Sequence, residues 1–209
     1  KLISPGRFIP LAEENGQILE IDNFVYKETF RLMQKWQQEG EQVPLISVNV
    51  SRLHLLQDEL PQYIKSLSDE YGLKPEQIEL EITESVFFQD TERLVAIIKQ
   101  MRDLGFVISM DDFGAGFSTL SLMKSLPVDV IKLDGSFFLK SELDDKNKAV
   151  IAAMLHLAEN LGFEVIAEGV EKKEQVDFIR GQGGRLVQGY YYYKPMPADE
   201  FEKLLTEKK

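Results

Sequence analysis

Carboxylate, amide and ammonium side chains recur along this sequence where apolar, β-branched runs end. Six such runs carry a polar residue in the C-terminal half or at the end, namely Asn49, Glu81, Asp111 with Asp112, Lys132 with Asp134, Glu168 and Gln188. Carboxylate and amide oxygens are the ligands that hard cations such as Mg²⁺ and Mn²⁺ prefer. Adjacent aspartates would let one carboxylate bridge two ions, and paired ions ~3.5 to 4 Å apart favour in-line attack on a phosphodiester. The residue types therefore indicate two-ion phosphodiester chemistry, with Lys132 adding a positive charge.

Each of these residues also has a structural explanation when it is considered alone. The Asp111–Asp112 pair could cap a turn, Glu79 and Glu81 could form the solvent-facing side of an edge strand, and Lys132 could be an ion-paired strand lysine. Burying several unpaired carboxylates together is costly unless a cation compensates them. The combination therefore favours a cation site.

Composition excludes several other function classes. The 209 residues contain no cysteine, so a disulfide framework, a thiolate zinc site and a cysteine nucleophile are ruled out. His54 and His156 have no partners at ligand spacing, and we interpret both as structural or surface residues. The net charge of −11 argues against a nucleic-acid polymer as the partner, and no segment approaches the ~20 apolar residues of a membrane span. We expect no membrane contact from this segment.

The polar residues must be positioned by alternating strands and helices. The strand candidates are 45–51, 78–83, 106–112, 128–134, 164–170 and 186–193, where the tyrosines at 190–193 would pack on both faces of the last strand. Between most of them lie helical patterns such as 91–104, with Leu94, Ile97, Ile98 and Met101 on one apolar face. Gly105 and Gly162 suit the left-handed C-caps of two helices.

Alternating strands and helices predict an α/β fold with a parallel sheet, either open or closed into a barrel. A barrel builds its site from the carboxyl ends of all its strands, whereas an open sheet concentrates its site at one switch point. Because all six runs place polar residues at that end, we predict a (β/α)8 TIM-like barrel. Eight strands are needed and six are visible, so we expect residues 1–209 to be a single domain whose first strand is missing from this chain.

The sequence resembles a known family, the EAL domains, which are bacterial phosphodiesterases of cyclic di-GMP. The resemblance implies an α/β fold of the modified (β/α)8 TIM-like barrel type. The resemblance covers the whole chain. It is carried, in family order, by the segments "GRFIPLAEENGQI", "SVNVS", "IELEITES", "ISMDDFGAGFSTLS", "LPVDVIKLDGSF", "VIAEGVEKKEQ" and "QGYYYYKPMP".

The resemblance implies a role for each site residue. Two ions, Mg²⁺ or Mn²⁺, would be held by Asn49, Glu81, Asp111, Asp112 and Glu168, with Asp111 bridging them. Lys132 would position or polarise the attacking water, and Glu168 would also act as general base. Supporting roles would fall to Glu84, which anchors the loop after the aspartates, and to Gln188, Asp134 and Glu171. The implied reaction is hydrolysis of cyclic di-GMP to linear pGpG in second-messenger signalling.

Three departures keep an alternative open. The Glu-Ala-Leu signature would precede Lys1, Ala115 and Phe117 stand where the family usually has Thr and Tyr, and Gly135 replaces the usual Arg. The alternative is a degenerate receptor or protein-interaction module without turnover. A barrel enzyme with Lys132 as a Schiff-base nucleophile is disfavoured, because the surrounding carboxylates should keep this lysine protonated.

The remaining expectations concern the chain's surroundings. We expect a cytoplasmic domain. Upstream sensor or cyclase domains in the parent chain are left open, and any membrane anchor would lie in other domains. Unpaired strand edges in an incomplete barrel would promote a homodimer. We expect the chain alone to show weak or no turnover.

Overall fold

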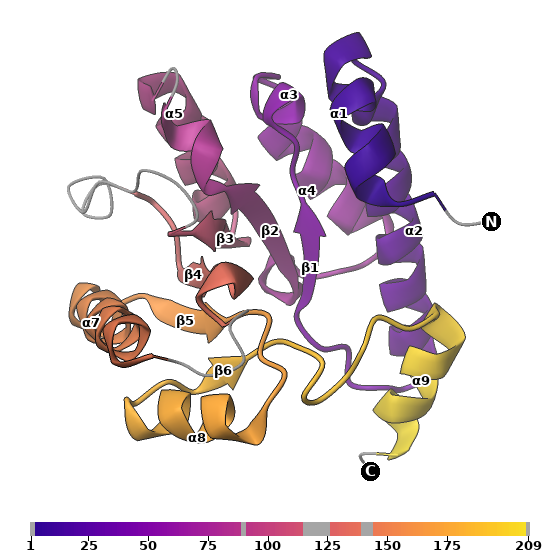
Figure 1. The fold of residues 1–209 in the computed structure, drawn as a ribbon. Coiled ribbons are helices and arrows are strands. Elements are labelled where there is room, and N and C mark those ends of the chain that lie inside the picture. The colour runs from indigo at the N-terminus through magenta and orange to yellow at the C-terminus, as the bar shows by residue number, and fades with distance from the viewer. Residues whose placement is uncertain (1–2, 89–90, 115–125, 139–143, 208–209) are drawn as a thin grey trace. The chain divides into compact units, whose positions relative to one another are not determined.

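The computed structural model describes residues 3–88, 91–114, 126–138 and 144–207. Over these ranges the chain divides into two compact units, of which the first comprises Lys1–Ile82 and Val86–Ile108 and the second Thr83–Ser85 and Ser109–Lys209. In each unit, parallel strands alternate with helices (Figure 1). That residues 1–209 form a single domain stays a prediction.

The first unit begins with two helices and continues through two parallel strands. Its elements are α1 (Pro5–Asn15), α2 (Ile18–Gln38), β1 (Ile46–Asn49), α3 (Arg52–Leu55), α4 (Leu60–Glu70), a short 3-10 helix (Pro75–Gln77), β2 (Ile78–Thr83) and α5 (Thr91–Asp103). Strand β1 pairs with β2 in a register that runs from Ile46 opposite Ile78 to Asn49 opposite Glu81. Both polar residues therefore stand at the carboxyl ends of neighbouring strands.

Helix α5 forms where its periodicity predicts it. Its four apolar positions, Leu94, Ile97, Ile98 and Met101, are all buried. Gly105, with a φ of 98°, lets the chain leave the helix and enter the next strand. The predicted helix and its core-facing side are confirmed.

The second unit contains four successive strands in parallel register. Its elements are β3 (Val107–Phe113), β4 (Val130–Leu133), a short 3-10 helix (Gly135–Phe137), α7 (Asp145–Leu161), β5 (Glu164–Ala167), α8 (Lys173–Gly181), β6 (Leu186–Val187) and α9 (Ala198–Glu207). A further 3-10 helix (Glu84–Phe88) follows β2. Strand β4 lies between β3 and β5 and is buried along its whole length, as the central strand of a parallel sheet must be.

The prediction that the last apolar run forms a strand to Tyr193 is wrong. Strand β6 ends at Val187, and beyond it the backbone N–H groups of Tyr192 and Tyr193 both donate to the carbonyl of Gly189, at 3.2 and 3.3 Å. The chain therefore turns instead of extending. The four tyrosines at 190–193 remain between 38 and 55% exposed and do not pack on two faces of a strand.

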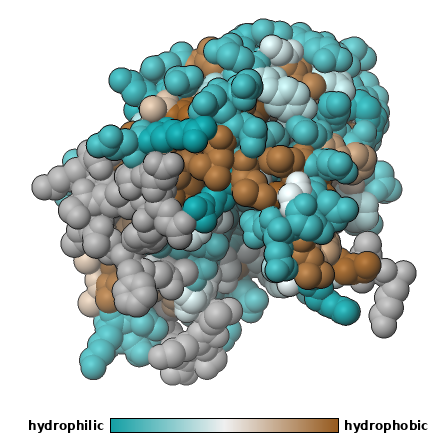
Figure 2. Space-filling view, turned by 90° about the horizontal axis from the view of Figure 1, so that it is seen from above, coloured by the Kyte–Doolittle hydropathy of each residue, from teal (hydrophilic) through white to brown (hydrophobic). Residues whose placement is uncertain are grey.

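Hydrophilic residues cover much of the face shown in Figure 2, with hydrophobic residues reaching the surface in patches. Charged residues make up 28% of the sequence, in keeping with this view. Among the described helices, none combines the length and the apolar character that crossing a membrane requires.

Candidate active site

Strand β3 is irregular where it carries its two aspartates. Its register with β4 shifts between Met110 and Phe113, and Asp112 adopts a φ of 57°. Of the described residues, Asp112 is the only non-glycine with a positive φ; aspartate tolerates this region better than most residues. In a regular strand, successive side chains point to opposite faces. The bulge removes this constraint and lets Asp111 and Asp112 both contribute to one cluster.

That cluster is completed from β5. One carboxylate oxygen each from Asp111, Asp112 and Glu168 lie within 4.8 Å of one another. Glu168 follows the last residue of β5, and its backbone N–H donates to the carbonyl of Leu133 at 3.0 Å, which continues the pairing with β4. This backbone hydrogen bond therefore fixes the position from which the Glu168 side chain extends.

Lys132 lies on β4, between β3, which carries Asp111 and Asp112, and β5, which Glu168 follows. Its positive charge neutralises part of the negative charge of the cluster. Lys132 is 3% exposed, and its Nζ lies 2.8 Å from Glu168 Oε1 and 3.3 Å from Asp111 Oδ1. Asp111 Oδ1 is itself buried and, within the described residues, accepts no well-formed hydrogen bond. One ammonium therefore faces two carboxylates, which stabilise its charged form and disfavour a Schiff-base role.

Asp112 shows that the cluster still carries excess negative charge. Burial, followed by the charges of Asp111 and Asp134, raises the pKa of Asp112 above its ordinary value, and Lys132 opposes this only in part. A divalent cation would relieve the same repulsion, and oxygen ligands of this kind suit a hard cation. The donor set therefore fits a hard divalent cation.

Two further predicted residues, Asp134 and Glu84, accept hydrogen bonds from backbone N–H groups in this region. The Asp134 side chain accepts from the backbone N–H of Ser136 at 2.9 Å and starts the 3-10 helix that follows β4. Buried Glu84 accepts from the backbone N–H of Gly114 at 3.2 Å, just after the aspartates. This bond supports the expected anchoring by Glu84. Ala115 and Phe117 lie outside the described residues.

A cleft of about 530 Å³ opens beside Glu168. Its lining includes Gln188, Glu171, Lys194 and, as backbone surfaces without side chains, Gly135, Gly169 and Gly189. A Cβ at Gly169 would lie 2.9 Å from the Cα of Gly135, so the two segments approach as closely as glycine allows. The cleft has a size and polarity suited to part of a nucleotide.

Gln175 was not predicted from the sequence as a site residue, although its side chain organises the segment after Glu168. This buried side chain accepts from the N–H groups of Glu171 and Lys172, at 2.8 and 2.9 Å, and donates to the carbonyl of Phe138 at 2.9 Å. It ties the segment after β5 to the one after β4. A Gln three residues into a helix is a capping signal that could have revealed it. The side chain of Glu171 itself is exposed.

The remaining predicted ligands, Asn49 and Glu81, lie in the first unit. They are register partners on β1 and β2, and the N–H of Val50 donates to the carbonyl of Glu81 at 2.9 Å. Glu81 is 8% exposed. The structure thus brings the predicted residues together in two groups, one within each unit. As predicted, neither histidine belongs to them, since His54 is buried against Asp22 and His156 is exposed.

Comparison with known proteins identifies the family. The EAL domain family model matches residues 1–195. The chain is 38% identical over 198 residues to the oxygen sensor protein DosP of Escherichia coli, covering 95% of this chain and 25% of DosP. It is 35% identical to the bifunctional diguanylate cyclase/cyclic di-GMP phosphodiesterase MucR of Pseudomonas aeruginosa, covering 95% of this chain and 29% of MucR. It thus spans only about a quarter of the length of these relatives.

A solved structure of the PaMucR phosphodiesterase in complex with c-di-GMP is 34% identical and superposes with a TM-score of 0.89, covering 95% of this chain and 81% of that one. The chain belongs to the EAL domain family. The likeness confirms the predicted fold class, an α/β fold of the modified (β/α)8 TIM-like barrel type.

Proposed function

We propose that this chain is the catalytic domain of a cyclic di-GMP phosphodiesterase that hydrolyses its substrate to linear pGpG with the help of Mg²⁺ or Mn²⁺. The observation that carries the proposal is the cluster of Asp111, Asp112 and Glu168 around the buried ammonium of Lys132. Relatives named as cyclic di-GMP phosphodiesterases and the c-di-GMP complex of PaMucR support the choice of substrate.

The ligands proposed for the ions are Asn49, Glu81, Asp111, Asp112 and Glu168. Two divalent ions, when bound, would supply positive charge to the entering and leaving oxygens of the phosphodiester. The Oδ1 atom of Asp111 is buried and, among the described residues, accepts no well-formed hydrogen bond, so it has lone pairs to offer to a cation. Asn49 and Glu81 are assigned on the family pattern.

Lys132 and Glu168 act on the attacking water. Glu168 accepts a proton from it, and Lys132, 2.8 Å from Glu168 Oε1, orients that carboxylate. The same ammonium, 3.3 Å from Asp111 Oδ1, orients the aspartate. Gln188, Glu171, Asp134 and Glu84 support the cleft and its adjoining turns.

A receptor without turnover is the second candidate function. Gly135 favours it, because this residue lines the cleft with backbone where the family usually offers an arginine, so one cation for a phosphate is absent. The test is incubation of the full protein carrying this chain with cyclic di-GMP and Mn²⁺. Formation of pGpG supports the phosphodiesterase, and saturable binding without product supports the receptor.

The assembly and location are also proposals. We propose that the chain forms a homodimer and acts in the cytoplasm. Light scattering at increasing concentration would test the first proposal, with a shift from the 24.0 kDa of one chain toward twice that mass as the expected result. A constant mass of one chain would contradict it.

A further inference from the structure

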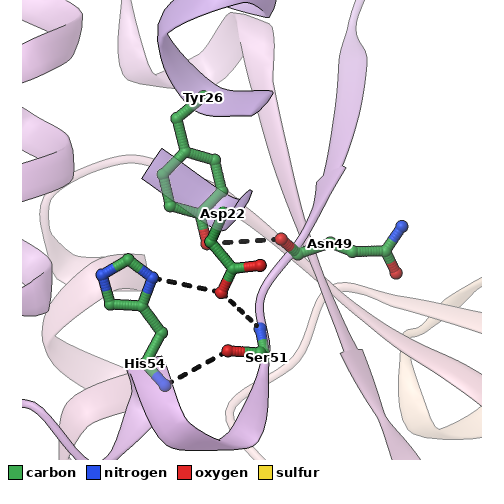
Figure 3. Close-up of polar contacts among 5 residues, drawn as sticks. All are labelled: Asp22, Tyr26, Asn49, Ser51 and His54. Carbon is green, nitrogen blue, oxygen red and sulfur yellow. Dashed lines mark hydrogen bonds and ion pairs between the residues drawn. The ribbon is translucent and has the colours of Figure 1, made fainter. Parts of the chain in front are cut away.

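A buried polar network in the first unit joins α2 to the end of β1 (Figure 3). Asp22, Tyr26 and His54 are 7, 0 and 6% exposed. Asp22 Oδ2 accepts from the backbone N–H of Ser51 at 3.3 Å and lies 3.2 Å from His54 Nδ1. The hydroxyl of Tyr26 donates to the backbone carbonyl of Asn49 at 3.3 Å.

The bonds of this network end on the backbone that carries Asn49. Three successive residues are fixed from two sides, because the carbonyl of Asn49 and the N–H of Ser51 bond to α2, while the N–H of Val50 bonds to β2. Figure 3 shows the Asn49 amide pointing away from Tyr26, so the network holds the backbone of Asn49 and does not engage its amide. Residues that orient a metal-ligating residue typically bond to it in this way, without contacting the metal themselves.

Tyr26 is held rigidly enough for this task. Its ring stacks on that of His54 with centroids 5.6 Å apart and an angle of 25° between the planes. The tyrosine is fully buried, and its hydroxyl donates to the carbonyl of Asn49 at 3.3 Å.

We propose that Tyr26, supported by Asp22 and His54, is a positioning residue that fixes Asn49 in the orientation needed to bind a divalent cation. The proposal rests on the proposed function, in which Asn49 is a metal ligand. Mg²⁺ demands near-ideal octahedral geometry and is sensitive to small displacements of a ligand. A buried hydroxyl that anchors the ligand's own carbonyl would limit such displacement.

The test measures Mn²⁺ affinity of the full protein without substrate, from the electron paramagnetic resonance signal of free Mn²⁺. Tyr26→Phe removes one hydroxyl and keeps the ring, and we expect it to weaken Mn²⁺ binding by about tenfold, the lower end of the effect of such supporting residues. Tyr71→Phe is the matched control. Tyr71 packs edge-on against Phe30, which lies on α2 together with Tyr26, but Tyr71 is outside the network. It should leave the affinity unchanged.

Asn49→Ala and the double variant separate positioning from a general effect on the fold. If Tyr26 acts through Asn49, adding Tyr26→Phe to Asn49→Ala produces no further loss of affinity. Equal losses in both backgrounds would overturn the inference, as would unchanged affinity in Tyr26→Phe beside a clear loss in Asn49→Ala. Unchanged affinity in Asn49→Ala would instead overturn the assignment of Asn49 in the proposed function.

Discussion

Lys132 Nζ lies 2.8 Å from Glu168 Oε1, and Lys132 is only 3% exposed. Lys132 lies on β4, and Glu168 directly follows β5, the neighbouring parallel strand. The pairing of these two strands therefore sets the distance between the two residues. A buried ammonium this close to a carboxylate cannot be removed without leaving charge uncompensated. Catalysis and the stability of the metal-free chain should therefore depend on Lys132 in different ways.

Lys132→Met should lower turnover of cyclic di-GMP by about 10²- to 10⁴-fold, the range typical of lost acid–base assistance. Mn²⁺ binding should persist, because Asp111 and Glu168 then lack their competing cation. Titration with Mn²⁺ alongside steady-state kinetics separates the two effects. Lys173→Met, on the exposed face of α8, serves as control and should change neither quantity. Full turnover by Lys132→Met would remove the lysine from the mechanism.

Asp112→Asn should raise the melting temperature of the metal-free protein. The raised pKa of Asp112, caused first by burial and then by Asp111 and Asp134, means that the folded state disfavours its charge. This destabilisation is fully present above the folded-state pKa and disappears below the unfolded value of about 4, so the gain should be larger at pH 7 than at pH 4. Calorimetry of the wild-type protein and the variant in EDTA measures the gain in melting temperature at each pH.

The same calorimetric series contains its own control. Adding Mn²⁺ should stabilise the wild-type protein more than Asp112→Asn, since the variant has lost a ligand. Asp177→Asn, which breaks an exposed pair with Lys173, should not raise the melting temperature at all. A lower melting temperature for metal-free Asp112→Asn would show that this carboxylate stabilises the fold.

Gly189→Ala should strongly destabilise the protein. A Cβ at this position would lie 2.1 Å from the carbonyl oxygen of Val170, so the backbone beside the cleft must move. Overpacking of this kind costs about 1 to 3 kcal/mol or more. Gly181→Ala is the control, because nothing lies within 4 Å of its added Cβ. Urea denaturation should show a large loss for the first variant and none for the second; equal midpoints would contradict the observed close approach.

Gln175→Leu should destabilise the turn that follows Glu168. The substitution leaves the N–H groups of Glu171 and Lys172 and the carbonyl of Phe138 without their partner. The bond to Phe138 is buried and the other two are partly buried, and an unsatisfied buried group costs about 1 to 3 kcal/mol. Hydrogen exchange should report faster exchange at Glu171 and Lys172, and Gln175→Glu, which keeps one acceptor, should be milder. Unchanged exchange in Gln175→Leu would mean that these groups find other partners.

Local pattern was enough to predict where most elements lie. The β2 run was predicted to the residue, and the apolar face of α5 followed from helical periodicity. The bulge at Asp112 was not predictable, because its positive φ depends on pairing with β4 rather than on neighbours in the chain. The turn at Gly189 was hidden for a similar reason, since its partner Val170 comes from another strand end.

The candidate site was predicted as residue types but not as contacts. The resemblance to EAL domains named Asp111, Asp112 and Glu168, which the structure gathers into one cluster. The network around Tyr26 and His54 could not be read from the sequence, because Asp22 and His54 are 32 residues apart and meet only in the folded unit.

The most direct test follows the conversion of cyclic di-GMP by the full protein that carries this sequence, using chromatography, in Mn²⁺ and in excess EDTA. We predict linear pGpG as the product in Mn²⁺ and none in EDTA. Equal turnover in EDTA, or cyclic di-GMP that is bound and recovered intact in Mn²⁺, would contradict a metal-dependent phosphodiesterase built on Asp111, Asp112 and Glu168.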